Sequence, residues 1–248
     1  MKVVKCGNLL TLIFGVLIGI MNTSKLSAQV FEGKVTFERK TNLEKRYKGQ
    51  EMNRWMRGDM KKPKIDVFEL YFTDSASVFV PVESEIPDER EWSTMKNLSY
   101  QNLNSGIRKQ EFSFWGTKVV MQDTLRNRTW KITESSRNIA GYNCKQALWE
   151  VNDTLRIYAW YAEELISSTG PETFNGLPGV ILGLATEDGG VVYFAKEVKP
   201  MNVNITEYIP KVKEKDLYNE TSLRALVADR FSNWGSFADR MVDDLFLW

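Results

Sequence analysis

The chain of 248 residues contains no histidine. Histidine is the commonest general base near neutral pH and the commonest zinc ligand. Its absence removes the Ser-His-Asp and Cys-His arrangements of many hydrolases and most zinc sites. We therefore expect no catalytic residues, no metal ligands and no cofactor, and we expect that the protein is not an enzyme.

Cysteine is nearly absent as well, with Cys6 and Cys144 as its two occurrences. Cys6 lies in a segment that we expect to be removed, so the mature chain should form no internal disulfide. Cys144 sits in a strand-like pattern without an activating neighbour, which favours a buried structural thiol over a nucleophile. Stability must then come from a hydrophobic core, and the roughly 220 remaining residues are enough for one sizeable domain.

Neither sign of charge is in excess, because 33 Lys and Arg stand against 32 Asp and Glu. A short basic run, Lys61-Lys62-Pro63-Lys64, is typical of a solvated loop. This balance excludes nucleic acid and anionic membranes as expected partners.

A long apolar run is also missing. Residues 9–20 are apolar, but a membrane-spanning helix needs about twenty such residues. Lys2 and Lys5 precede the run and Leu26-Ser27-Ala28 follows it, which gives the three zones of a secretory signal peptide. We predict cleavage near Ala28, a periplasmic or secreted location, and no permanent membrane span after processing.

The rest of the chain is dominated by short strand patterns. In residues 33–40, Val35 and Phe37 alternate with polar side chains, which indicates a half-buried strand. Short β-branched and aromatic runs follow, separated by turn signals such as Asp188-Gly189-Gly190. Such short turns join antiparallel neighbours. Further strands are predicted at residues 67–72, 77–82, 112–115, 119–125, 128–134, 142–151, 155–161, 180–185 and 191–198.

Three segments do not follow this pattern. Residues 43–64 are polar and predict a loop or short surface helix, and residues 83–111 predict an exposed excursion. Near the end, apolar residues recur every three or four positions, which predicts an amphipathic helix packed on the sheet, with docking onto another protein as the alternative. The stripe is Leu223, Val227, Phe231, Trp234, Ala238, Met241, Leu245 and Trp248.

These patterns predict a mainly β fold. Residues 1–28 form the signal peptide and residues 29–248 a single domain, in which an antiparallel meander makes a curved sheet with the C-terminal amphipathic helix packed on it.

The most distinctive segment is the one from residue 158 to residue 184. Leu177 precedes a proline and should be extended, Pro178 presets the second position of a turn, and Gly179 can take the positive φ of the third position of a type II turn. We predict that this turn leads into the apolar strand Val180-Ile181-Leu182.

This segment resembles the GLPGLI family of secreted proteins from Gram-negative bacteria. The resemblance covers about residues 128–200 and departs from the family pattern at Val180, at Gly183 and at Leu165-Ile166. The motif residues are Gly170, Pro171, Phe174, Gly176, Leu177, Pro178, Gly179, Val180 and Ile181, and the associated residues are Gly141, Tyr142, Cys144, Trp160 and Tyr161.

The resemblance implies a periplasmic or outer-surface location. It also implies a fold like the half-open antiparallel barrel, with a packed helix, of periplasmic lipoprotein carriers. It implies no reaction, because the family is defined by a motif and a fold by itself does not establish function.

Two carboxylate pairs near the motif, Glu163-Glu164 and Glu187-Asp188, are candidates for acid–base chemistry. Neither lies in an apolar stretch, so solvated turn residues are the favoured interpretation. The tryptophans of the strand region are expected to fill the core, although some could line an apolar cavity. They are Trp115, Trp130, Trp149 and Trp160.

Two functional hypotheses follow. The first is a binding module in which the apolar face of the sheet, closed by the terminal helix, holds an apolar or lipid-like ligand. The second is an accessory subunit of an envelope complex, such as an outer-membrane transporter or a secretion apparatus, which contacts its partner through residues 43–64 and 83–111.

Overall fold

The structure is a computed structural model that describes residues 29–48, 60–86, 88–114, 116–232, 242–243 and 245–248. The predicted signal peptide, Trp115, and three residues of the predicted helical stripe, Trp234, Ala238 and Met241, lie outside these ranges.

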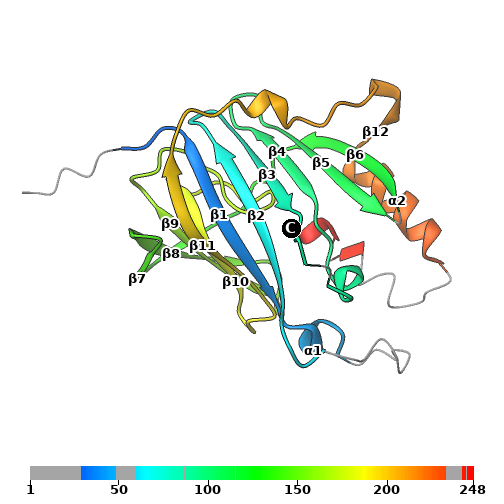
Figure 1. The fold of residues 1–248 in the computed structure, drawn as a ribbon, viewed down its shortest axis with the longest axis horizontal. Coiled ribbons are helices and arrows are strands. Elements are labelled where there is room, and N and C mark those ends of the chain that lie inside the picture. Colours follow the sequence, from blue (N-terminus) through cyan, green and yellow to red (C-terminus); the bar gives the residue numbers. More distant parts are fainter. Residues whose placement is uncertain (1–28, 49–59, 87, 115, 233–241, 244) are drawn as a thin grey trace, which may run out of the picture.

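Most of the described chain forms β-strands, as predicted (Figure 1). Two α-helices, α1 (Leu43–Arg46) and α2 (Glu220–Arg230), three single 3-10 turns, Glu91–Ser93, Ile205–Glu207 and Glu214–Asp216, and the helical residues 242–243 and 245–247 complete the regular structure of the described chain. The strands are β1 (Gly33–Thr41), β2 (Lys64–Phe72), β3 (Ala76–Val82), β4 (Leu98–Asn102), β5 (Ile107–Phe114), β6 (Thr117–Thr124), β7 (Lys131–Ile139), β8 (Tyr142–Glu150), β9 (Arg156–Ala162), β10 (Val180–Thr186), β11 (Val191–Pro200) and β12 (Leu217–Tyr218).

These strands belong to one open, curved sheet with the order β12-β6-β5-β4-β3-β2-β1-β11-β10-β9-β8-β7. Neighbouring strands are antiparallel, apart from the short parallel ladder between β12 and β6. β1 is central because it pairs with β2 on one side and β11 on the other. The predicted curved antiparallel meander is therefore confirmed.

The inner face of the sheet is covered by the chain itself. The irregular loop 163–179, between β9 and β10, and the chain end near Trp248 both pack against inward side chains of the central strands. Figure 1 accordingly shows the C-terminus near the middle of the sheet. Phe174 and Leu177 of the loop are buried with Phe37 and Phe68 of the sheet in the largest apolar cluster.

Helix α2 covers the other end of the sheet. Leu223 and Val227 face Phe112 of β5 and Met121 of β6, and they are buried in a second apolar cluster. The Asn219 side chain accepts from the backbone of Ser222, closing a capping box that satisfies the first turn of the helix. The predicted packing of a C-terminal amphipathic helix on the sheet is confirmed over these residues.

Residues 83–111 are not an exposed excursion, and that prediction was wrong. β4 and the first part of β5 lie within this segment. Ser99, Gln101 and Gln110 point inward and are buried, although they are polar. The strands were missed because a period-two pattern is visible in a sequence only when the buried face is apolar.

The predicted type II turn is also corrected. Gly179 has the expected positive φ of 149°, but its N–H donates to the carbonyl of Leu177 at 2.9 Å, so the turn closes over three residues. The Val180 N–H donates instead to Leu165 in the loop, at 3.2 Å. A Cβ on Gly179 would lie 2.2 Å from the carbonyl oxygen of Ala162, so close backbone approach also requires glycine here.

Candidate functional site

A buried ion-pair cluster lies on the inner face of the sheet. Arg39 of β1 stands directly opposite Asp66 of β2 in the strand register, and its Nη2 donates to Asp66 Oδ2 at 2.7 Å. Lys64 lies two residues earlier on the same face, and its Nζ donates to Asp66 Oδ1, also at 2.7 Å. All three side chains are buried. Period-two geometry thus brings three charges to one place inside the sheet.

The electrostatics of this cluster favour full ionisation. Burial alone would raise the pKa of Asp66, but Arg39 and Lys64 outweigh that effect and lower it. Burial would likewise lower the pKa of Arg39, yet Tyr193, Asp66 and Glu172 together raise it. Asp66 is therefore a carboxylate that already has its two cationic partners.

Glu172 brings the motif loop to the same cluster. Its carboxyl Oε1 accepts from the hydroxyl of Tyr193 at 2.8 Å and lies 3.7 Å from Nη1 of Arg39. Its other oxygen, Oε2, is buried and has no hydrogen-bond partner. The Ser99 hydroxyl also lies near the carboxyl and favours its ionised form.

Both the backbone and the ionisation of Glu172 are unusual. The residue has a φ of +54°, in the left-handed region that non-glycine residues rarely adopt. The side chain is 1% exposed, and burial raises its pKa even though Arg39 and Tyr193 act in the opposite direction. Strained backbone and perturbed ionisation concentrate at functional sites.

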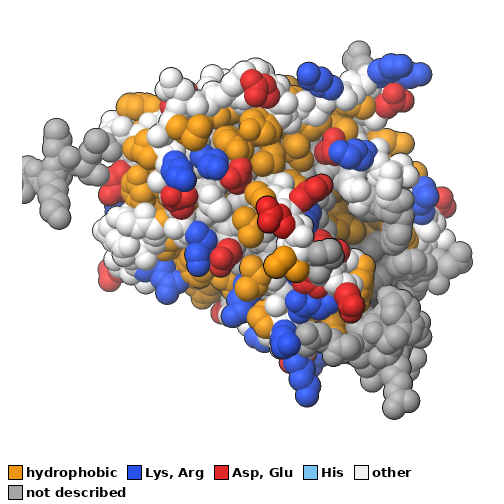
Figure 2. Space-filling model, in the orientation of Figure 1, with side chains coloured by type: hydrophobic (Ala, Val, Ile, Leu, Met, Phe, Trp, Pro, Cys, Tyr) orange, Lys and Arg blue, Asp and Glu red, His pale blue; other side chains and the backbone are white. Residues whose placement is uncertain are grey.

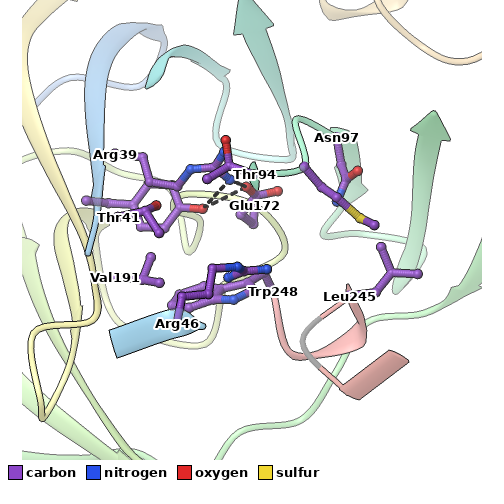
Figure 3. A pocket seen from close by; sticks show the side chains of 11 residues that line it. Arg39, Thr41, Arg46, Thr94, Asn97, Glu172, Val191, Leu245 and Trp248 are labelled. Carbon is purple, nitrogen blue, oxygen red and sulfur yellow. Dashed lines mark hydrogen bonds and ion pairs between the residues drawn. The ribbon is translucent and has the colours of Figure 1, made fainter. Parts of the chain in front are cut away.

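A hollow opens above this carboxyl (Figure 3). Glu172 lies between Arg39 and Asn97 in this view, and Trp248 lies across the hollow. The space open to the centres of water molecules is about 30 Å³, room for a few ordered waters, since one water needs about 10–15 Å³. The lining residues are Arg39, Thr41, Arg46, Thr94, Met95, Asn97, Glu172, Val191, Tyr193, Leu245 and Trp248.

Helix α1 and the turn Glu91–Ser93 form a rim beside the hollow. Tyr47, just after α1, packs its ring 5.7 Å from that of Trp92 and donates to the carbonyl of Ser93 at 2.8 Å. Trp92 is 45% exposed, so the rim presents a large apolar side chain to the outside. Figure 2 shows where further hydrophobic side chains reach the surface on the side of the molecule that it draws.

A second buried polar network joins the motif loop to the inner face. The hydroxyls of Ser77 and Thr169 lie 2.5 Å apart, and Nδ2 of Asn175 donates to Oε1 of Gln101 at 2.8 Å. Arg128 donates to the carbonyl of Thr173 at 2.9 Å. Buried polar groups need such partners, so this network fixes the position of the loop that carries Glu172.

The motif residues predicted from the sequence are mainly structural. Phe174, Leu177, Val180 and Ile181 are buried in the main apolar cluster. Pro171 is buried, whereas Gly176 and Pro178 are exposed. A Cβ on Gly170 would lie 2.6 Å from Cβ of Ile181, so the loop approaches β10 too closely for a side chain there.

The motif-associated residues lie on β8 and β9 or next to them, away from the hollow. Gly141 has a φ of 89° at the turn before β8, Tyr142 and Trp160 are half-buried, and Tyr161 is buried. Cys144 is buried, and burial, helped by Glu164, raises the pKa of its thiol to about 12. This environment matches the predicted inert thiol.

The two carboxylate pairs do not line the hollow. Glu163 makes an exposed ion pair with Lys145 at 2.7 Å, and Glu187 pairs with Arg156 at 3.2 Å. Asp188 accepts from the Thr186 hydroxyl at 2.7 Å, in the turn between β10 and β11. These are surface and turn contacts, which agrees with the interpretation of both pairs as solvated turn residues.

Sequence reasoning missed the polar residues of the motif loop. Glu172 lines the hollow, and Thr173 and Asn175 anchor the loop, yet all three lie between the motif positions. One signal was available in the sequence. Arg39 follows Val35 and Phe37 on the apolar side of the alternating strand, which predicts a buried guanidinium that needs a charged or polar partner.

Neither a metal cluster nor a membrane helix appears in the part of the chain that the structure describes. No three His, Cys, Asp or Glu side chains gather there as metal ligands. Among the same residues, no helix has the length and apolar character needed to cross a bilayer.

Comparison of sequences gives one family match. A family described as "Protein of unknown function (Porph_ging)" matches residues 145–183, which include the motif residues 170–181. No curated protein matches the chain.

Comparison of structures finds a similar fold in PNGF-II. Its structure in a C2 space group has a TM-score of 0.52 and 16% identity, covering 76% of this chain and 31% of that chain. Its structure in a P21 space group has a TM-score of 0.54 and 14% identity, covering 79% and 32%. The chain therefore spans about a third of the length of PNGF-II, and the likeness concerns the fold alone.

An uncharacterized conserved protein from Thermus thermophilus is also similar, at 6% identity and a TM-score of 0.40, over 78% of this chain and 91% of that one.

Proposed function

We propose that the protein is a ligand-binding module of the bacterial cell envelope and that the hollow above Glu172 is its binding site. The observation that carries the proposal is the setting of Glu172: a buried carboxyl with a raised pKa, held by left-handed backbone, in the lining of an open space. Strained backbone and perturbed ionisation beside a hollow are typical of binding sites.

The shape of the site defines the ligand further. The apolar side chains of the inner face contact the chain's own loop and C-terminal segment, so an entirely apolar ligand would have to displace them. The hollow instead combines an apolar wall of Val191, Leu245 and Trp248 with a polar floor. We infer a ligand that turns a polar group toward the polar side chains of the lining and an apolar surface toward Val191, Leu245 and Trp248.

Native mass spectrometry of protein purified from its natural host tests this function. We expect a bound non-protein mass on the wild type, and its loss in Val191→Phe, because the larger side chain fills the hollow. Val192→Phe is the matched control, since the next residue of β11 faces the other side of the sheet. Absence of a bound mass, or equal occupancy in both variants, would contradict the proposal.

We further propose that the segment matched at residues 145–183 is a GLPGLI motif segment and that the protein is exported. The Lys2, Lys5 and apolar run of residues 9–20 support cleavage near Ala28. N-terminal sequencing of the protein from its host, together with its distribution between periplasm and medium, tests this. An N-terminus at Met1 on the natural protein would refute export by cleavage.

An accessory role in an envelope complex is the second candidate. It is favoured by the rim, where Trp92 packs against Tyr47 and exposes 45% of its surface. Aromatic side chains are enriched at protein contacts. Crosslinking in the host should recover a partner protein, and Trp92→Ala should lower its recovery. Ile132→Ala, which changes an exposed residue of β7, is the control and should leave the recovery unchanged. Equal recovery by both variants would contradict this candidate.

A further inference from the structure

The chain just before β1 is tied to the motif loop. Val30 forms a parallel bridge with Leu165, in which its N–H donates to the carbonyl of Glu164 at 2.8 Å and its carbonyl accepts from the N–H of Ile166 at 2.7 Å. Both backbone groups of Val30 are thereby satisfied. A cut that removes the predicted export signal leaves this bridge intact only if it falls before Val30.

Cleavage after Ala28 meets this condition and makes Gln29 the first residue of the mature chain. Signals are cut after a small residue, and Ala28 is the small residue nearest to the bridge in the sequence. Gln29 is exposed. The mature chain then has one exposed residue ahead of the bridge, and that residue carries the α-amine.

A glutamine at the start of a chain can react with its own amine. The uncharged amine attacks the side-chain carbonyl carbon Cδ, a new N–Cδ bond closes a five-membered lactam ring, and the bond from Cδ to the side-chain nitrogen breaks. That nitrogen leaves as ammonia, together with a proton from the amine. No oxidant, reductant or further reactant is consumed. The product, pyroglutamate, has no α-amine and therefore no terminal charge.

The fold leaves both reacting groups of Gln29 free. Neither its backbone nitrogen nor its side-chain amide makes a hydrogen bond to another residue in the part of the chain that the structure describes. The ring is built from atoms of Gln29 alone, so the N–H of Val30 keeps its bond to Glu164. Reaction at this residue therefore requires no change in the rest of the fold.

We propose that Gln29 is a modification site, at which the exported chain, cut after Ala28, cyclises to pyroglutamate. The mature protein then begins with a neutral ring next to the bridge between Val30 and Leu165. Chain ends are preferred sites of proteolysis, and aminopeptidases need a free α-amine. The ring therefore keeps such enzymes from trimming the chain into the bridge that holds the motif loop. This inference rests on the proposed export, and it specifies the chemical state in which the exported chain begins.

Peptide mass spectrometry of the protein purified from its natural host tests the modification. The protein is unfolded and its free amines are dimethylated before digestion with trypsin, so that a ring formed during digestion is not counted. Trypsin then cuts after arginine alone, and the first peptide runs from Gln29 to Arg39. We expect a peptide that is labelled on Lys34 but not on its terminus, and that is one ammonia lighter than the open chain.

Gln29→Asn, expressed in the same host, is the matched control. Asparagine keeps the amide, but its reaction with the amine would have to close a strained four-membered ring. We therefore expect a dimethylated terminus in this variant, at residue 29 or, after trimming by an aminopeptidase, at Val30. A dimethylated Gln29 in the wild type would overturn the modification, and so would a terminus that is blocked in both proteins.

The first residue of the peptide separates this inference from the proposed export. A start at Gln29 with a labelled amine leaves export by cleavage standing and overturns the ring. A start at another residue after the apolar run also leaves export standing, and it overturns the ring because Gln29 is then not terminal. A chain that begins at Met1 overturns both.

Discussion

The hydroxyl of Tyr193 on β11 donates a hydrogen bond of 2.8 Å to Oε1 of Glu172 in the motif loop. Nη1 of Arg39 on the neighbouring strand β1 donates in turn to the Tyr193 hydroxyl, at 3.4 Å. Two strands of the sheet thus hold the carboxyl of a strained loop residue at the edge of a hollow. This contact ties the motif loop, which is otherwise apolar and structural, to the ion-pair cluster.

The first prediction concerns the pH dependence that Glu172 imposes on stability. Burial raises its pKa, so its stabilising contribution is present below the ordinary carboxyl pKa and is lost as the pH rises through the raised value. Glu172→Gln cannot ionise and should be more stable than the wild type at pH 8, by on the order of 1 kcal/mol, with the gap closing toward pH 4. Urea unfolding across this range measures it, and a gap that is the same at both ends would contradict the assignment.

The second prediction concerns the buried ion pair. Asp66→Asn leaves Arg39 and Lys64 buried without their shared carboxylate, which should cost about 3–5 kcal/mol of unfolding free energy. Glu69→Gln, on the same strand, breaks the half-buried pair with Lys34 and should cost about 1 kcal/mol or less.

Acid should weaken the Asp66 contribution. Arg39 and Lys64 hold the pKa of Asp66 below its ordinary value, so the stability that it provides is present above the ordinary carboxyl pKa and disappears as the pH falls through the lowered one. Urea unfolding at pH 7 and pH 3 should therefore show a smaller cost of Asp66→Asn at pH 3. An equal cost at both values would show that Asp66 is not ionised in the cluster.

The third prediction compares two reasons why a position requires glycine, namely close approach of a neighbouring backbone and a positive φ. Gly179→Ala would place a Cβ 2.2 Å from the Ala162 carbonyl, so it should cost about 3 kcal/mol or more, or prevent folding. Gly189→Ala has a positive φ of 67° but open space around the new Cβ, and it should cost about 1 kcal/mol. Thermal unfolding of both variants makes the comparison. Equal costs would show that the three-residue turn is not packed as described.

The fourth prediction concerns the thiol. Because burial raises the pKa of Cys144 to about 12, the folded protein should resist alkylation at pH 8 and react only when it is unfolded. A second cysteine at exposed Ser135 on β7, introduced by Ser135→Cys, should react at once. Mass spectrometry after timed iodoacetamide treatment counts the labels, and rapid labelling of Cys144 in the folded state would refute its burial.

The sequence allowed the apolar part of the fold to be predicted. β1, β8, β9, β10 and β11 were found because their inward residues are apolar or aromatic, and their alternation is visible without tertiary information. β4 was missed because its inward side chains, Ser99 and Gln101, are polar and become buried only through partners such as Thr169 and Asn175, far along the chain.

The candidate site was less predictable for the same physical reason. The pairing of Arg39 with Glu172 depends on a loop that crosses the inner face of the sheet, and no local pattern encodes that crossing. The motif drew attention to glycine, proline and apolar positions, which shape the loop. The polar residue between them, Glu172, acquires its significance only from the strand residues that it meets.

A crystal structure of the protein purified from its natural host, without added ligand, tests the central claim most directly. The account predicts density for a bound molecule in the hollow between Glu172 and Trp248, with one polar atom within hydrogen-bond distance, ~3 Å, of a polar side chain of the lining. A hollow occupied by water alone, while native mass spectrometry of the same sample shows a bound ligand, would place the binding site elsewhere and contradict the account.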